Sequence, residues 1–212
     1  MPRESLRSRP NLPICTHVSE DDRRPPGRLG QQFDPVLTAA RSGAGWAAGR
    51  LWASVGAQVA GYLRAQGAPE PDDLASEVFI GVLRSLGSFS GDEERFRSWV
   101  FTIAHRRLVD ERRRLARRPP ASPLDDDERG GASPSASAED EALRRLSEER
   151  VRRVCERLVP DQRDVLLLRL VGGLTSEEVA AALGKSPGAV RALQRRGVAS
   201  LRRIFEQEGV PR

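Results

Sequence analysis

The residues of this chain that can do chemistry are mainly arginines, and their pattern favours binding over catalysis. The segment from Lys185 to Arg203 carries basic side chains and no carboxylate. An arginine can donate to both O6 and N7 of a guanine, whereas lysines and helix N-termini hold phosphates. Arg191 and Arg195 are therefore candidate base readers of duplex DNA. The other candidates on this surface are Lys185, Ser186, Gln194 and Arg196.

Two short helices about a glycine turn would position these side chains between residues 174 and 203. Thr175 can cap the first helix, and Glu178 can reach back to the Thr175 backbone N–H in a capping box. Gly184 tolerates positive φ, and Ser186 with Pro187 can begin the second helix. The spacing predicts a helix-turn-helix, although an ordinary helical hairpin with solvated arginines shares the local pattern.

The composition agrees with a nucleic-acid partner and argues against a membrane protein. The 212 residues carry a net charge of +5, with a pI of about 10.3 and 35 basic residues, of which only Lys185 is a lysine. No stretch approaches the roughly 18 consecutive apolar residues that a membrane span needs. The first 32 residues lack the apolar core of a signal peptide. We therefore expect a cytoplasmic protein without membrane insertion.

No set of residues suggests catalysis, a metal or another cofactor. The two histidines, His17 and His105, fall in a tail and in an arginine cluster, and Cys15 and Cys155 lack paired metal-ligand spacing. Cys155 shares a helical face with apolar residues, so we interpret it as a small buried side chain. With no phosphate-cradling loop either, the sequence predicts a protein that is not an enzyme.

Composition and periodicity divide the chain into two helical blocks. No segment alternates with period two, so we predict an all-α fold of two small domains. The expected division is a disordered tail at 1–32, a first domain at 33–118, a flexible acidic linker at 119–141, a second domain at 142–206 and a tail at 207–212.

The first block is expected to hold amphipathic helices separated by polar turns. Trp46 lies on the expected inward stripe of one helix and Leu83 on that of the next. A polar loop from Gly87 to Glu94 then precedes a helix whose inward side chains include Phe96 and Trp99. This aromatic helix runs into an arginine cluster between residues 105 and 118.

Three sequence motifs occur in order along these two blocks. They are DLASEVF at 73–79, FRSWVFTIAHRRLVDERRR at 96–114 and LVPDQRDVLLLR at 158–169. Together they resemble the extracytoplasmic-function sigma factors, the compact two-domain initiation subunits of bacterial RNA polymerase. The first motif is similar to the family's polymerase-docking helix, the second to the segment that reads and opens the −10 element, and the third to the start of the −35-binding domain.

The resemblance implies an alternative sigma factor that binds core RNA polymerase at its clamp and flap regions and recognises −35 and −10 elements of promoter DNA. The helix-turn-helix would read the −35 element. An unpaired −10 base would enter a pocket made by the loop at 89–94, with arginines holding the strand. An anti-sigma factor is a candidate partner. Candidates for polymerase docking are Asp73, Glu77 and Phe79. Candidates for −10 binding are Phe89, Ser90, Gly91, Asp92, Arg97, Arg106, Arg107, Arg113 and Arg114.

Two other interpretations use some of the same features. A helix-turn-helix transcriptional regulator would bind DNA without acting as a polymerase subunit. An adaptor or anti-activator would bind a protein through its helices and use its arginines nonspecifically. Neither needs the docking sequence at 73–79 or an aromatic helix that leads into an arginine cluster.

Overall fold

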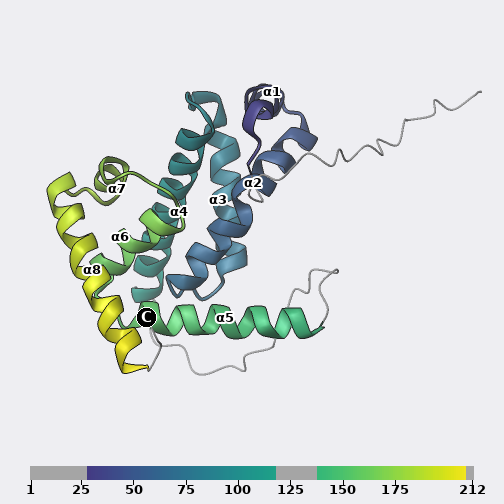
Figure 1. Cartoon of the computed structure of the whole chain (residues 1–212). Coiled ribbons are helices and arrows are strands. Elements are labelled where there is room, and N and C mark those ends of the chain that lie inside the picture. Colours follow the sequence, from purple (N-terminus) through teal and green to yellow (C-terminus); the bar gives the residue numbers. More distant parts are fainter. Residues whose placement is uncertain (1–27, 118–137, 209–212) are drawn as a thin grey trace, which may run out of the picture.

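The computed structural model describes residues 28–117 and 138–208, with side chains of the second range described from residue 145 (Figure 1). Within these ranges the chain is helical and has no strand, which confirms the all-α fold class. The expected tail up to residue 27, most of the expected linker and the tail from residue 209 lie outside the described residues. The helices are η1 (Gly30–Gln32), α1 (Phe33–Arg41), α2 (Gly45–Ala65), α3 (Pro71–Ser85), η2 (Leu86–Ser88), α4 (Glu93–Ala116), α5 (Ala138–Glu156), α6 (Pro160–Leu170), α7 (Ser176–Leu183) and α8 (Pro187–Gln207).

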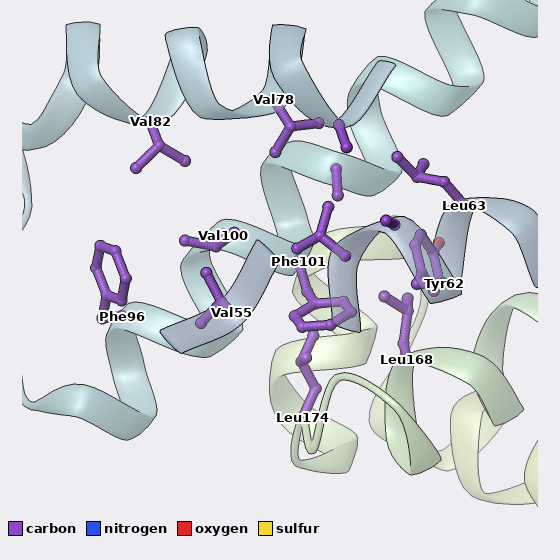
Figure 2. Close-up of a cluster of buried hydrophobic side chains, with 14 of the residues drawn as sticks. Val55, Tyr62, Leu63, Val78, Val82, Phe96, Val100, Phe101, Leu168 and Leu174 are labelled. Carbon is purple, nitrogen blue, oxygen red and sulfur yellow. The ribbon is translucent and has the colours of Figure 1, made fainter. Parts of the chain in front are cut away.

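Helices α1 to α4 form the first domain, with α2 in contact with the other three. Val55 of α2, Val78 of α3 and Val100 of α4 are buried in its core (Figure 2). The Asp92 carboxylate accepts a hydrogen bond from the Arg95 backbone N–H at 2.9 Å and so caps the start of α4. This cap fixes where the longest helix of the domain leaves the preceding loop.

Helices α6 to α8 form the body of the second domain, in which α8 packs against both α6 and α7. Helix α5 contacts α2 of the first domain and joins α6 and α8 through Val154, which packs with Leu166 and Ile204. Gly197 of α8 allows a close approach to α6, because a Cβ atom there would lie 2.8 Å from Leu166 Cδ1. Gly173, with a φ of +71°, follows α6 and turns the chain toward α7. The short α7 and the long α8 therefore both pack against α6.

The two domains share one apolar core. Figure 2 shows Phe101 of α4 beside Leu168 of α6 and Leu174 of the α6–α7 loop, and all three side chains are fully buried. A Cβ atom at Gly172 would lie 3.1 Å from Phe101 Cδ1, so the backbone of the second domain approaches this ring closely. The sequence did not predict this seam, because the contact joins segments far apart in the chain.

Two inward assignments within the first domain are wrong. The Trp46 side chain is 61% exposed, because Ala47 and Leu51, one turn apart, take the inward stripe of α2. Leu83 is 38% exposed, because α3 faces the core through residues at a spacing of four that end at Val82.

Two expected boundaries also move. Residues 28–32 belong to the packed structure instead of the tail, because Leu29 is buried and the backbone N–H groups of Leu29 and Gly30 donate to the Glu93 carboxylate at 2.6 and 2.8 Å. Helix α5 begins at Ala138, inside the segment expected to be linker.

Candidate nucleic-acid interface

The helix-turn-helix has the local geometry that its sequence predicts. Thr175 Oγ1 accepts from the Glu178 backbone N–H at 3.2 Å, and the Glu178 carboxylate accepts from the Thr175 N–H at 2.7 Å, completing the capping box. Gly184 ends α7 with a φ of +62°. Ser186 caps α8 by accepting from the Ala189 N–H at 3.2 Å, and Pro187 is the first residue of α8. These local signals fix the angle at which α8 leaves the turn.

Helix α8 separates an apolar inner face from a basic outer face. Val190 and Ile204 are buried against the rest of the domain. The exposed arginines of α8 are Arg191, Arg195, Arg196, Arg202 and Arg203. A shallow hollow runs along this helix, and it is lined by Gly188, Arg191, Ala192, Gln194, Arg195, Val198, Ala199 and Arg202. Small residues between arginines leave room for base edges to approach the helix.

Neighbouring carboxylates position two of the cations at this surface. Lys185 Nζ lies 2.9 Å from an Asp161 oxygen, and Arg191 Nη1 lies 3.2 Å from a Glu177 oxygen. Among the described residues Arg195 has no ion pair. Exposed pairs of this kind are worth about 1 kcal/mol or less, so a phosphate or a base can replace the carboxylate at small cost.

The loop before α4 packs against aromatic rings of the first domain. Phe89 packs edge-on against Phe96 at a centroid distance of 5.5 Å and lies 5.0 Å from the ring of Trp99. Arg41 donates to the carbonyl of Leu86 at 3.3 Å and to the carbonyl of Phe89. The loop backbone is therefore anchored to α1 and α4.

This packing divides the loop residues that the sequence proposed for −10 binding. Ser90 and Asp92 are exposed, and Gly91 adopts a φ of +149°, which favours glycine. Phe89 is only 8% exposed, so its ring supports the loop and does not face an incoming base. Trp99 is half-buried and contributes to the same aromatic support.

The arginines in the C-terminal half of α4 differ in exposure and in their partners. Arg106 is exposed, Arg107 is half-buried beside Gly81, and Arg113 lies 3.8 Å from Asp110 in an exposed pair. Arg114 forms a hydrogen-bonded pair with Glu111 at 2.7 Å, which raises the pKa of the guanidinium. The outward cations at this end of α4 are thus available to a nucleic-acid backbone.

Arg97 is placed differently from these arginines. Its guanidinium lies 6.0 Å from the Phe101 ring centroid and close to Gly173 of the second domain. Burial, and secondarily the positive charge of Arg28, lowers the pKa of Arg97. This candidate −10 residue therefore sits at the seam between the domains.

Helix α3 presents an acidic and apolar surface. Asp73 and Glu77 are exposed, as the docking prediction requires. Phe79 is half-buried and stacks on Trp52 at a centroid distance of 4.7 Å, so it supports the helix from within. Ile80 is 48% exposed on the same stripe as Asp73 and Glu77. Its spacing of three after Glu77 could have identified it in the sequence.

The second domain has an apolar groove that the sequence did not predict. It lies between α5, α6 and α8 and is lined almost entirely by apolar side chains. Leu170 is 70% exposed, Val151 50% and Phe205 38%. Contiguous exposed apolar surface of this kind marks a site of protein interaction.

Other candidate chemistry is missing from the described part of the chain. It contains no group of three metal-ligating side chains, and no helix in it has the length and hydropathy needed to cross a membrane. Cys155 is buried, as expected, and burial raises the pKa of its thiol. The arrangement as a whole defines a DNA-binding protein with two helical domains.

Comparison with known proteins specifies this class further. Residues 52–118 match sigma-70 region 2, and residues 148–201 match sigma-70 region 4. The chain is 32% identical over 177 residues to the extracytoplasmic-function sigma factor BldN of Streptomyces coelicolor, covering 82% of this chain and 66% of BldN. It is 31% identical to the sigma factor SigD of Mycobacterium tuberculosis, over 82% of this chain and 84% of SigD.

A solved structure gives the same result. The sigma factor CnrH, solved in complex with the cytosolic domain of CnrY, superimposes with a TM-score of 0.59 at 26% identity, covering 82% of this chain and 96% of CnrH. The chain therefore belongs to the sigma-70 family, in its extracytoplasmic-function group. It is an alternative sigma factor that directs transcription initiation by RNA polymerase at promoters. The match to region 2 disfavours a DNA-binding regulator that is not a polymerase subunit.

Proposed function

We propose that three separate surfaces of this sigma factor perform −35 recognition, −10 binding and attachment to core polymerase. The observation that carries the proposal is the placement of exposed cations on α8 and the end of α4, with an acidic stripe on α3. The expected domains at 33–118 and 142–206 contain the family matches at 52–118 and 148–201. This supports assigning recognition of the −10 and −35 elements to different domains.

The −35 surface consists of the hollow along α8. Arg191 and Arg195 read guanine edges in the major groove, with Gln194 beside them. Arg196, Lys185 and the Ser186 end of the helix hold phosphates, because they flank the hollow and the helix N-terminus favours an anion.

The −10 surface consists of the exposed part of the loop at 90–92 and the outward arginines of α4. Unpaired bases need a polar pocket, and their backbone needs cations. In this proposal the loop residues Ser90, Gly91 and Asp92 would surround the flipped base. The cations would come from Arg106, Arg107, Arg113 and Arg114. Phe89 acts in this proposal by supporting the loop from beneath.

Core polymerase is contacted by both domains. Asp73, Glu77 and Ile80 of α3 form a surface suited to a basic and apolar partner such as the polymerase clamp. The apolar groove of the second domain suits a helix from the flap region. An anti-sigma factor that covers these surfaces would compete with the polymerase, and the CnrH structure, solved with the cytosolic domain of CnrY, supports this kind of regulation.

This sigma factor works without catalysis of its own and acts in the bacterial cytoplasm, where polymerase and chromosome meet. Sigma factors are generally initiation factors without enzymatic activity, and the sequence shows no constellation of catalytic residues. Bond formation is left to the polymerase core.

Reconstitution with core polymerase tests the three surfaces separately. We expect Glu77→Arg to abolish co-elution with core polymerase. Arg195→Ala should retain core binding and lower binding to −35 DNA about 10- to 100-fold, corresponding to one lost bidentate base contact. Arg106→Ala should retain both and reduce permanganate-detected opening of the −10 region.

Arg50→Ala is the matched control, because Arg50 is an exposed arginine of α2 that bonds only Gln32 among the described residues. It should behave as the wild type in each assay. Transcription from every promoter at wild-type rate by the Arg195→Ala chain would refute the −35 assignment.

A further inference from the structure

A buried polar cluster lies where the two domains meet. The Gln66 amide nitrogen donates to Asp164 of α6 at 2.8 Å, while Arg112 of α4 donates to the Gln66 side-chain oxygen at 2.9 Å and to its backbone carbonyl at 2.7 Å. Tyr62 Oη and His105 Nδ1 are 2.9 Å apart, and Gln66 also lies within 3.4 Å of Tyr62 Oη. We call these five residues the polar clasp.

Asp164 is the member that the second domain contributes. Its carboxylate accepts from Gln66 and lies 4.0 Å from the Arg112 guanidinium, so one carboxylate meets two donors of the first domain. Gln66 is 2% exposed, its oxygen accepts from Arg112, and the shortest hydrogen bond of its nitrogen is the one to Asp164. Because burying an unpaired amide is costly, the clasp specifies one docking geometry for the second domain.

The clasp continues an apolar seam along one stripe of α4. Arg97, Phe101 and His105 follow one another at a spacing of four, and Arg112 lies further along the same helix. Phe101 contacts the second domain at Gly172, and Arg97 approaches Gly173. The docked second domain therefore covers the Arg97 and Phe101 part of this stripe, on the same helix as the exposed arginines that are proposed to hold the opened strand.

The closed arrangement is also too short to span a promoter. Elements centred near −35 and −10 are about 25 base pairs apart, or roughly 85 Å of duplex at 3.4 Å per base pair. A compact body of about 160 residues has a radius of gyration of roughly 15 Å. Domains in direct contact cannot reach both elements together.

We propose that the polar clasp is an autoinhibitory lock between Asp164 of the second domain and Gln66 and Arg112 of the first, which must open before the sigma factor can engage a promoter. The functional consequence rests on the promoter-binding role proposed above. Closed chains are not competent, so the apparent affinity for core polymerase is reduced by the open fraction. Contacts that core polymerase makes with the open form shift the population toward it.

Removing the Asp164 carboxylate should open the lock. In the closed Asp164→Ala chain, the Gln66 amide loses its 2.8 Å partner and Arg112 loses the nearby carboxylate, whereas water can hydrate both groups in the open chain. Opening should therefore become about 10- to 100-fold more favourable. Asp164→Asn keeps an oxygen for Gln66 and loses only the charge near Arg112, so its shift should be smaller. The isosteric side chain also guards against simple misfolding.

Energy transfer between dyes on the full chain measures the opening directly. Dyes attached at Ala53→Cys of α2 and Ala181→Cys of α7, both exposed positions, report the distance between the domains. Cys15 and Cys155 are replaced by alanine in every chain. Glu156→Ala is the matched control, because it removes an exposed carboxylate of the same domain that pairs with Arg152 and, among the described residues, contacts no member of the polar clasp.

We expect reduced transfer in Asp164→Ala, an intermediate value in Asp164→Asn and wild-type transfer in Glu156→Ala. If opening limits assembly, Asp164→Ala should also bind core polymerase about tenfold more tightly, whereas a merely destabilised chain would bind less. Unchanged energy transfer in both Asp164 variants overturns the lock. Reduced transfer with no binding of core polymerase by any chain keeps the lock and overturns the proposed function instead.

Discussion

The recognition helix depends on a close helix contact that one methyl group should disturb. A Cβ atom at Gly197 of α8 would lie 2.8 Å from Leu166 Cδ1 and 3.1 Å from Leu166 Cγ. Replacing an interior helical glycine by alanine ordinarily stabilises by about 1 kcal/mol, whereas overpacking a filled contact costs about 1–3 kcal/mol. We expect Gly197→Ala to lower the free energy of unfolding by up to about 2 kcal/mol.

Gly61 of α2 offers the matched control, because it is also inside a helix and its Cβ would meet nothing within 4 Å. Gly61→Ala should therefore gain about 1 kcal/mol of stability. Urea unfolding followed by circular dichroism measures both changes. If Gly197→Ala stabilised the chain as much as Gly61→Ala, the inferred contact between α6 and α8 would be wrong.

Two further predictions concern charge. Arg196→Ala should weaken binding to all DNA and reduce the salt dependence by about one unit of slope, whereas Arg191→Ala should mainly change sequence preference. Salt titrations of DNA affinity on matched and unrelated duplexes measure both effects. Equal losses of affinity on every duplex for both variants would refute the distinction. Burial lowers the pKa of His105 below its usual 6.5, so the unfolded state binds more protons there and stability should fall as pH drops below about 6.5. Urea unfolding at pH 7.5 and 5.5 should show a smaller loss of unfolding free energy in His105→Gln than in the wild type. An equal loss in both chains would contradict this prediction.

The helix-turn-helix was predictable because its signals are local. The Thr175 capping box, the positive φ of Gly184 and the Ser186 cap each depend on residues within one helical turn. Backbone hydrogen-bonding needs therefore appear directly in the sequence. The direction of α8 and its exposed arginines follow from those local constraints.

The seam was not predictable by the same means. Phe101 and His105 stand beside an arginine cluster, which locally favours a solvated helix face. They are nevertheless buried, because Tyr62 of α2 contacts both and Gly172, after α6, closely approaches Phe101. Trp46 shows the opposite case, since its apolar character predicts burial but no helix in the described part of the chain covers it. Tertiary contacts between distant segments decide both positions, and periodicity carries no information about the partner.

Helix α4 illustrates why one arginine cluster should not be assigned one role. Arg106 and Arg113 extend toward solvent, where they can hold a nucleic-acid backbone. Arg112 donates instead to Gln66 and lies near Asp164, so in the closed chain its charge serves the contact between domains. When the domains separate, its guanidinium loses the Asp164 carboxylate and becomes available to a phosphate. Opening would then add the charge of Arg112 to that of Arg106 and Arg113, which are already exposed in the closed chain, and this would couple domain separation to strand binding.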